Sequence, residues 1–189
     1  MNRLASPAQL RASYMRWALF LVPLVVLLGF LSGQLSGSSS ESAWFAALDK
    51  PAIFPPSVAF PIVWTILYAL MGLALAQVCT AWRARWRTPA IVAFVIQLAV
   101  SLTWSPVFFG QHQLTTGLYI IFALDVLVII TVWLFWKVRK TAAVMLLPYL
   151  AWILFASVLN WQFLELNPDL DGVDAPGAVQ RISISRPAT

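Results

Sequence analysis

The stretch GLYIIFALDVLVIITVWLFW, from Gly117 to Trp136, decides the fold because Asp125 is its single charged residue. A helix needs about 20 apolar residues to cross a hydrocarbon core, whereas a membrane-spanning strand needs about 9 to 11 residues of alternating polarity. This run is apolar on all sides and does not alternate. It therefore predicts a transmembrane helix.

Four further runs have nearly the same length and character, namely residues 17–35, 60–81, 89–109 and 141–163. Of the 189 residues, 61% are hydrophobic and 10% are charged, whereas about 25% are charged in an ordinary soluble domain. The sequence therefore predicts an all-α integral membrane bundle of five transmembrane helices.

The first run has a second interpretation, because Arg3, Arg11 and Arg16 precede an apolar core that gives way to LSGQLSGSSS. This arrangement also describes a cleavable signal peptide, whose removal would leave four helices. Without cleavage, we expect an amino-terminal segment (residues 1–16), a transmembrane domain (17–163) and a mobile polar tail (164–189).

Basic residues are distributed unequally around the runs. Nine Lys and Arg lie on the side of the amino terminus, and the other side carries Lys50 and two tail arginines. The positive-inside rule therefore predicts a cytoplasmic amino terminus and an external carboxyl terminus. The membrane is expected to be the bacterial cell membrane or, alternatively, an outer membrane.

Composition also limits the chemistry. The net charge of +5 comes from short basic clusters between apolar runs, so we expect membrane lipid and no nucleic acid as a partner. One cysteine and one histidine cannot form a disulfide framework or a zinc cluster. We find no catalytic triad and no phosphate-binding glycine loop, which gives little support to a conventional enzyme or a required cofactor.

Three stripes at helical spacing combine aromatic rings with hydrogen-bonding groups. They comprise Trp64, Tyr68 and Met71; Gln97, Ser101, Trp104 and Phe108; and Tyr149, Trp152, Ala156 and Asn160. Each stripe alone fits ordinary interhelical packing. Their concentration towards the outer side favours an aromatic-lined ligand pocket there.

Two ionisable residues leave alternatives open. Asp125 is expected to be a ligand contact or proton-linked group, or else a neutral carboxyl bonded across helices. His112 lies in a loop, where it is solvated or, alternatively, faces a haem at the outer mouth.

The stretch LDKPAIFPPSVAFPIVW, from Leu48 to Trp64, belongs to a loop predicted over residues 36–59. Proline fixes φ and lacks an N–H, so Pro51, Pro55 and Pro56 hold an irregular segment that no regular helix includes. Such a stiff segment serves as a cover or as a spacer.

Four motifs occur in order along the chain. They are W-F-x-x-L-x-K-P-x-x-x-P-P (44–56), V-W-T-I-L-Y-x-x-M-G (63–72), Q-L-x-x-S-x-x-W-S-P-V-F-F-G (97–110) and P-Y-L-A-W-x-x-F-A-x-x-L-N (148–160). Together they resemble the tryptophan-rich sensory protein family, also called translocator protein or peripheral-type benzodiazepine receptor. The resemblance runs from about Trp17 to Trp161.

The resemblance implies a five-helix membrane protein, commonly a homodimer, whose first loop closes a ligand pocket. The ligands of this family are porphyrins, isoquinoline and benzodiazepine-type molecules and, in animal relatives, cholesterol. For this chain we expect a porphyrin such as protoporphyrin IX or haem. The prolines would then stiffen a lid. The resemblance implies ligand contacts at Trp44, Phe45, Trp64, Ser101, Trp104, Trp152 and Ala156. The helical stripes and the carboxylate within a span add the candidates Tyr68, Gln97, Asp125, Tyr149 and Asn160.

Three departures from the family pattern affect the expected ligands. Ser101 stands where the family usually has Asn, and Phe45 replaces the usual Tyr, so an amide and a phenol hydroxyl are lost and drug-like ligands are expected to bind differently. After Asn160, the cholesterol pattern needs Tyr and then Lys or Arg, whereas this chain has Trp161, Phe163 and Glu165. We therefore do not expect cholesterol to bind.

The leading hypothesis is a membrane receptor or sensor for porphyrins. The alternatives are a tetrapyrrole or lipid transporter, although no internal repeat supports one, and light- and oxygen-dependent porphyrin breakdown without a triad. For the dimer, Gly29 and Gly33 have the small-xxx-small spacing of a helix interface, or else pack within the monomer.

Ala156 lies four residues from both Trp152 and Asn160, so it belongs to the third stripe. Ala156→Thr is expected to weaken binding of bulky rigid ligands, at an overpacking cost of about 1 to 3 kcal/mol, with the bundle still folded. The dissociation constant and the melting temperature are measured together. An unchanged dissociation constant with a lowered melting temperature would assign Ala156 to packing alone.

Overall fold

The structure is a computed structural model, described here over residues 6–36 and 42–173. Five helical segments are long and apolar enough to cross a membrane. They are α1 (Pro7–Leu35), α3 (Ala59–Cys79), α4 (Arg87–Ser105) continued by the π-helical turn η1 (Pro106–Gly110), α5 (Leu114–Val138) and α6 (Lys140–Leu166). The predicted five-helix bundle is confirmed, and the described residues contain no strand.

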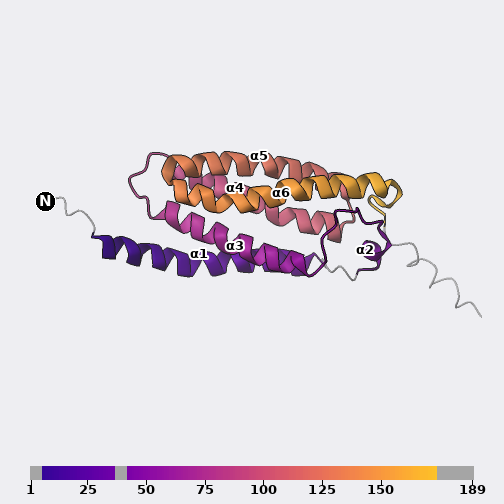
Figure 1. Ribbon diagram of the computed structural model, residues 1–189, viewed down its shortest axis with the longest axis horizontal. Helices are drawn as coiled ribbons and strands as arrows, with labels where there is room; N and C mark the ends of the chain where they lie inside the picture. Colours follow the sequence, from indigo (N-terminus) through magenta and orange to yellow (C-terminus); the bar gives the residue numbers. More distant parts are fainter. Residues whose placement is uncertain (1–5, 37–41, 174–189) are drawn as a thin grey trace, which may run out of the picture.

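The long helices run side by side along the axis of the molecule (Figure 1). Helix α1 packs mainly on α3, α3 packs on α6, and α5 packs on both α4 and α6. Two short helices, α2 (Ala43–Ala47) and η2 (Pro168–Leu170), lie at the end of the bundle where α6 ends. We call this end the cap end, and residues 42–58 the cap.

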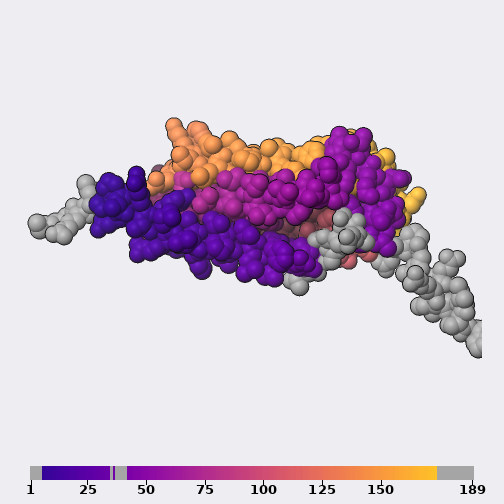
Figure 2. Space-filling model, turned by 60° about the horizontal axis from the view of Figure 1, so that its bottom comes forward, coloured from indigo at the N-terminus to yellow at the C-terminus, as the bar shows by residue number. Residues whose placement is uncertain are grey.

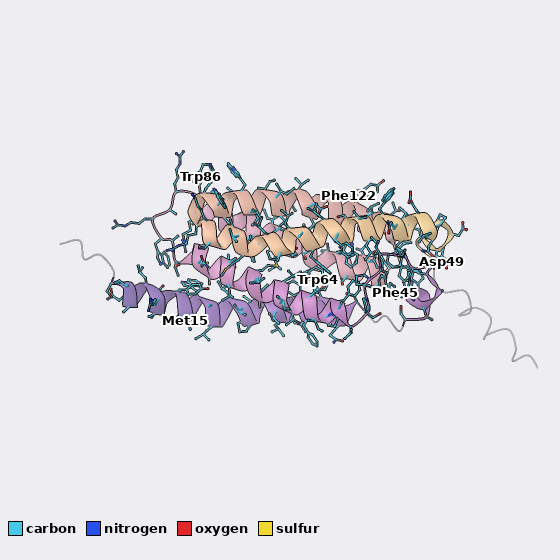
Figure 3. All side chains as sticks on the ribbon, viewed as in Figure 1. Met15, Phe45, Asp49, Trp64, Trp86 and Phe122 are labelled. Atoms are coloured by element: carbon cyan, nitrogen blue, oxygen red, sulfur yellow. The ribbon has the colours of Figure 1, made fainter. Side chains whose placement is uncertain are left out.

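The outer faces of the bundle are apolar. Met15 and Phe122 point away from the helices in Figure 3 and are 55% and 48% exposed. Other exposed apolar residues on these faces include Leu19, Phe20, Val92, Val126 and Leu147. Lipid tails solvate such a surface, as expected of a multi-pass integral membrane protein.

Helix α1 begins ten residues before the predicted Trp17. The Ser6 hydroxyl accepts a hydrogen bond from the Gln9 N–H at 3.3 Å, and the Gln9 side chain accepts one from the Ser6 N–H at 2.9 Å. This is a capping box, with Pro7 in the first helical position. The start of α1 is thus fixed by capping, whereas hydropathy reports only the membrane-spanning part.

The predicted tail also begins too early. Helix α6 continues to Leu166, and Asn167 behind it is 4% exposed. The side chains of Asn167 and Asp171 form hydrogen bonds with backbone groups distant in sequence, which a hydropathy pattern does not report. Residues 174–189 lie outside the described part of the chain.

Two glycines bring α1 against α3. A Cβ atom on Gly72 would lie 2.7 Å from the Cα atom of Val22, and one on Gly29 would lie 2.1 Å from a ring carbon of Tyr68. Gly29 therefore packs within the monomer, which was the alternative to a dimer interface at this residue.

Gly72→Ala is expected to destabilise the bundle by about 1 to 3 kcal/mol, because the methyl group would force the α1 backbone away from α3. The measurement is thermal unfolding in detergent. The matched control is Gly110→Ala, where the added methyl meets nothing nearer than 3.4 Å. Equal melting temperatures for the two variants would contradict a tight α1–α3 contact.

Candidate ligand-binding site

Local hydrogen bonds fix the shape of the cap. The Phe45 N–H donates to the Ser42 hydroxyl at 3.2 Å at the start of α2, while the Phe54 N–H donates to the Pro51 carbonyl at 2.9 Å. The Pro51 turn and the helix cap thus fix the local shape of the segment that carries α2. In Figure 2 the cap, in purple, covers the cap end beside the yellow carboxyl-terminal residues.

Aromatic rings from the cap and from three helical segments meet beneath it. We call this group the aromatic cluster; it comprises Trp44, Phe45, Phe54, Phe60, Trp104, Phe108, Phe109, Phe155 and Phe163. The Trp44 and Phe45 side chains are only 2% and 3% exposed. The ring centroid of Phe45 lies 5.5 Å from that of Phe109 and 5.8 Å from that of Phe163. The structure therefore places the two predicted cap residues against the bundle.

Phe108 lies within this cluster. Its ring stacks on Trp104 at 4.8 Å and meets Trp44 edge-on at 5.8 Å. It belongs to the π-helical turn that begins at Pro106, a residue without an N–H to continue the α-helical ladder. Sequence reasoning placed Phe108 in a stripe but not among the site residues, and it missed Phe54, Phe60, Phe109 and Phe163. Their aromatic character was the available signal.

A second group lies midway along the bundle, among α4, α5 and α6. We call Gln97, Ser101, Asp125 and Tyr149 the central polar cluster; each is more than 90% buried. Five of their polar atoms make no hydrogen bond of ordinary geometry: both polar atoms of the Gln97 amide, the Ser101 hydroxyl, Asp125 Oδ1 and the Tyr149 hydroxyl, although the last of these lies near the Ser101 hydroxyl. Unpaired buried groups are costly, and those that occur in native proteins often have a functional cause.

Asp125 is only half paired. The Ser157 hydroxyl of α6 donates to its Oδ2 atom at 2.7 Å, which joins α5 to α6. Asp125 thus has the cross-helix bond that one interpretation expected. Its unpaired Oδ1 atom is also compatible with the other interpretation, in which Asp125 is a ligand contact or a proton-linked group.

Aromatic rings lie beside the central polar cluster. Trp64 stacks on Tyr68 at 5.1 Å and meets Tyr149 edge-on at 6.3 Å. The phenols of Tyr68 and Tyr149 both lie near the Ser101 hydroxyl. In Figure 3, Trp64 lies inward along the bundle from the cap residues Phe45 and Asp49. Two of the predicted site residues, Tyr68 on α3 and Tyr149 on α6, are thus brought to Ser101 on α4, and Trp64 packs on both.

Trp152 connects the two groups. It packs on the helical core around the central polar cluster, and its ring lies 5.8 Å from Phe60 and 5.6 Å from Phe155 in the aromatic cluster. Ala156, one turn further along α6, is half-buried. The predicted site residues therefore form two adjoining groups with Trp152 between them.

Asn160 differs from the other predicted contacts because its amide already has partners. Its Oδ1 atom accepts from the Trp104 indole N–H at 3.2 Å, and its Nδ2 atom donates to the Leu114 carbonyl at 3.0 Å. It thereby joins α6 to α4 and α5. These two bonds fix the orientation of the amide, so Asn160 serves first to position Trp104.

The loop residues have aromatic partners. The His112 ring stacks on Trp44 at 4.6 Å, and the Lys50 ammonium lies 5.6 Å from the Phe45 ring centroid. Across residues 6–36 and 42–173, no group of three His, Cys, Asp or Glu side chains could hold a metal ion. Within this part of the chain, the site residues can therefore stack and hydrogen-bond, but they form no metal centre.

The chain is similar in sequence to a known family of membrane proteins over most of its length. The sequence profile of the TspO/MBR family matches residues 20–166. The chain is 40% identical to the tryptophan-rich protein TspO of Chlorobaculum tepidum over 148 residues, which cover 78% of this chain and 93% of that protein. It is 34% identical to the tryptophan-rich sensory protein of Cereibacter sphaeroides (81% and 94% covered) and 31% identical to the translocator protein of Bos taurus (74% and 83% covered).

Gln97 and Asn160 give opposite expectations for stability. Gln97→Met removes two unpaired buried atoms at similar volume, so the melting temperature should stay level or rise. Asn160→Leu leaves the buried Trp104 N–H without its partner and removes the side-chain bond to the Leu114 carbonyl, so it should cost about 2 kcal/mol. Thermal unfolding of both variants in detergent tests this contrast. A decrease for Gln97→Met as large as that for Asn160→Leu would contradict it.

Proposed function

Because this chain belongs to the TspO/MBR family of membrane sensor and translocator proteins, we propose that it is a receptor for tetrapyrroles such as protoporphyrin IX or haem. The observation that carries the proposal is the aromatic cluster beneath the cap, adjoining unpaired buried polar groups. No cofactor is required for this function.

A tetrapyrrole suits this environment because its macrocycle is flat, apolar and aromatic on both faces. Rings of Trp44, Trp104 and Trp152, with Trp64 deeper in the bundle, offer stacking partners from the cap and from three helices. Aromatic pairs are worth about 0.5 to 1.5 kcal/mol each beyond the area that they bury. Since Trp44 and Phe45 of the cap are buried against the bundle, the cap must move for a ligand to enter.

The edge groups of the ligand have separate partners in this proposal. The carboxylates of protoporphyrin IX remain at the cap end near Lys50, which is exposed. The central polar cluster contains no basic side chain, so it suits a neutral hydrogen-bonding group and disfavours a carboxylate. The basic residues at the opposite end then face the cytoplasm, following the positive-inside rule.

Transport and porphyrin breakdown remain the alternative functions. Prolines inside α1 and α6 (Pro23 and Pro148) are positions where helices bend, as transport would require. Uptake of protoporphyrin IX by proteoliposomes would identify a transporter. A porphyrin spectrum that changes only with protein, light and oxygen together would identify a degrading activity.

Titration with protoporphyrin IX in detergent tests the proposed binding. Saturable quenching of tryptophan fluorescence at micromolar ligand is expected, and Trp152→Ala should raise the dissociation constant about tenfold, since one lost stacking partner is worth about 1.4 kcal/mol. The matched control is Trp82→Ala, which removes a tryptophan that is 65% exposed at the opposite end. Absence of saturable quenching in the parent protein would refute tetrapyrrole binding.

A further inference from the structure

Residues 167–173, directly after α6, pair with the cap. The Asp49 N–H donates to Asn167 Oδ1 at 2.7 Å, and Asn167 Nδ2 donates to the Asp49 carbonyl at 3.0 Å. The side-chain amide thus pairs with both backbone groups of one residue, as a neighbouring β-strand would. Asn167 Nδ2 also donates to the Phe163 carbonyl at 2.9 Å, which orients the amide.

The same segment holds Trp44. The Trp44 indole N–H donates to the Leu170 carbonyl at 3.3 Å, and its ring stacks on His112. The His112 carbonyl in turn accepts from the Gly172 N–H at 2.8 Å. His112 has a φ of 57°, an uncommon conformation for a residue other than glycine. Its backbone and its ring therefore both contribute to the contact among cap, loop and tail.

Asp171 anchors the segment to α5. Its carboxylate accepts from the backbone N–H of Leu114 at 2.6 Å, and from the N–H and hydroxyl of Thr115 at 3.2 and 2.5 Å. The residue before α5, Gln113, makes no side-chain cap of its own. A carboxylate in this position satisfies free N–H groups and complements the positive end of the helix dipole.

We propose that residues 167–173 form a latch that keeps the cap closed over the aromatic cluster, with Asn167 as its positioning residue. The apolar contacts of Phe45 and Phe54 are non-directional and allow the cap to slide. The two Asn167–Asp49 bonds and the Trp44–Leu170 bond are directional, so the cap leaves its closed position only when they break. The latch itself does not depend on the proposed function; its effect on ligand exchange does.

Asn167→Ala and the isosteric Asn167→Asp test the latch, and Asp169→Asn serves as the control because Asp169 lies in the same segment and is exposed. Hydrogen exchange in nanodiscs, read by mass spectrometry, reports cap opening without any ligand. We expect exchange of residues 42–54 to be about tenfold faster in both Asn167 variants, while the control and α6 before Phe163 keep the parent rate. Melting temperatures confirm that each variant folds.

Two exchange outcomes would overturn the latch. One is equal exchange of the cap in the parent protein and both Asn167 variants. The other is faster exchange in Asp169→Asn, or along α6 to the same degree as in the cap, which would mean a general loss of packing.

Stopped-flow binding of protoporphyrin IX then tests ligand exchange. Both the association and the dissociation rate constants should rise about tenfold in the Asn167 variants, so that their ratio changes little. If hydrogen exchange of the cap is faster in the variants but both binding rate constants are unchanged, the latch does not control ligand entry. If the parent protein binds no protoporphyrin IX while the cap still exchanges faster in the variants, the proposed function fails and the latch stands.

Discussion

The structure depends on one constraint of the bilayer: backbone N–H and C=O groups in hydrocarbon must pair within the protein. Five long helices satisfy this constraint, and irregular backbone is left to the helix ends. At the cap end, the Asn167 side chain forms hydrogen bonds with the backbone N–H and C=O of Asp49 in the cap. Asp171 of the same segment accepts hydrogen bonds from free N–H groups at the start of α5. The cap and residues 167–173 therefore supply hydrogen-bond partners to each other.

Inside the bundle, buried polar side chains divide into two kinds. Asn160 and Ser157 have partners on neighbouring helices and fix how α4, α5 and α6 meet. The Gln97 amide is equally buried, yet neither of its polar atoms has a partner in the bundle. The first kind stabilises the fold. The second kind reduces stability, and such a cost is characteristic of positions that serve a ligand.

Much of the fold could be predicted from the sequence, because hydropathy and helical spacing report which segments span the membrane and which residues share a face. Hydrogen-bond pairing of side chains follows no sequence period. The sequence therefore placed Asn160 and Gln97 alike on site-facing stripes and could not show that only Asn160 has partners. The short helix α2 gives no hydropathy signal, and Asn167 meets Asp49 across a separation of 118 residues. The capping box at Ser6 was readable, but it lies outside the apolar run that was used to set the helix start.

In the aromatic cluster, a ligand competes with the cap for contacts with the aromatic rings. Trp44 and Phe45 are buried when the cap is closed, so a ligand must offer these rings contacts at least as good as Phe108, Phe109 and Phe163 do. Several contacts within the cluster are tilted or edge-on, whereas a flat macrocycle offers a full stacking face. Affinity is then the difference between two packed states, and better packing of these rings in the ligand-free cluster lowers the affinity for every ligand. A cap that carries its own aromatic rings can therefore seal the cluster and still select for planar ligands.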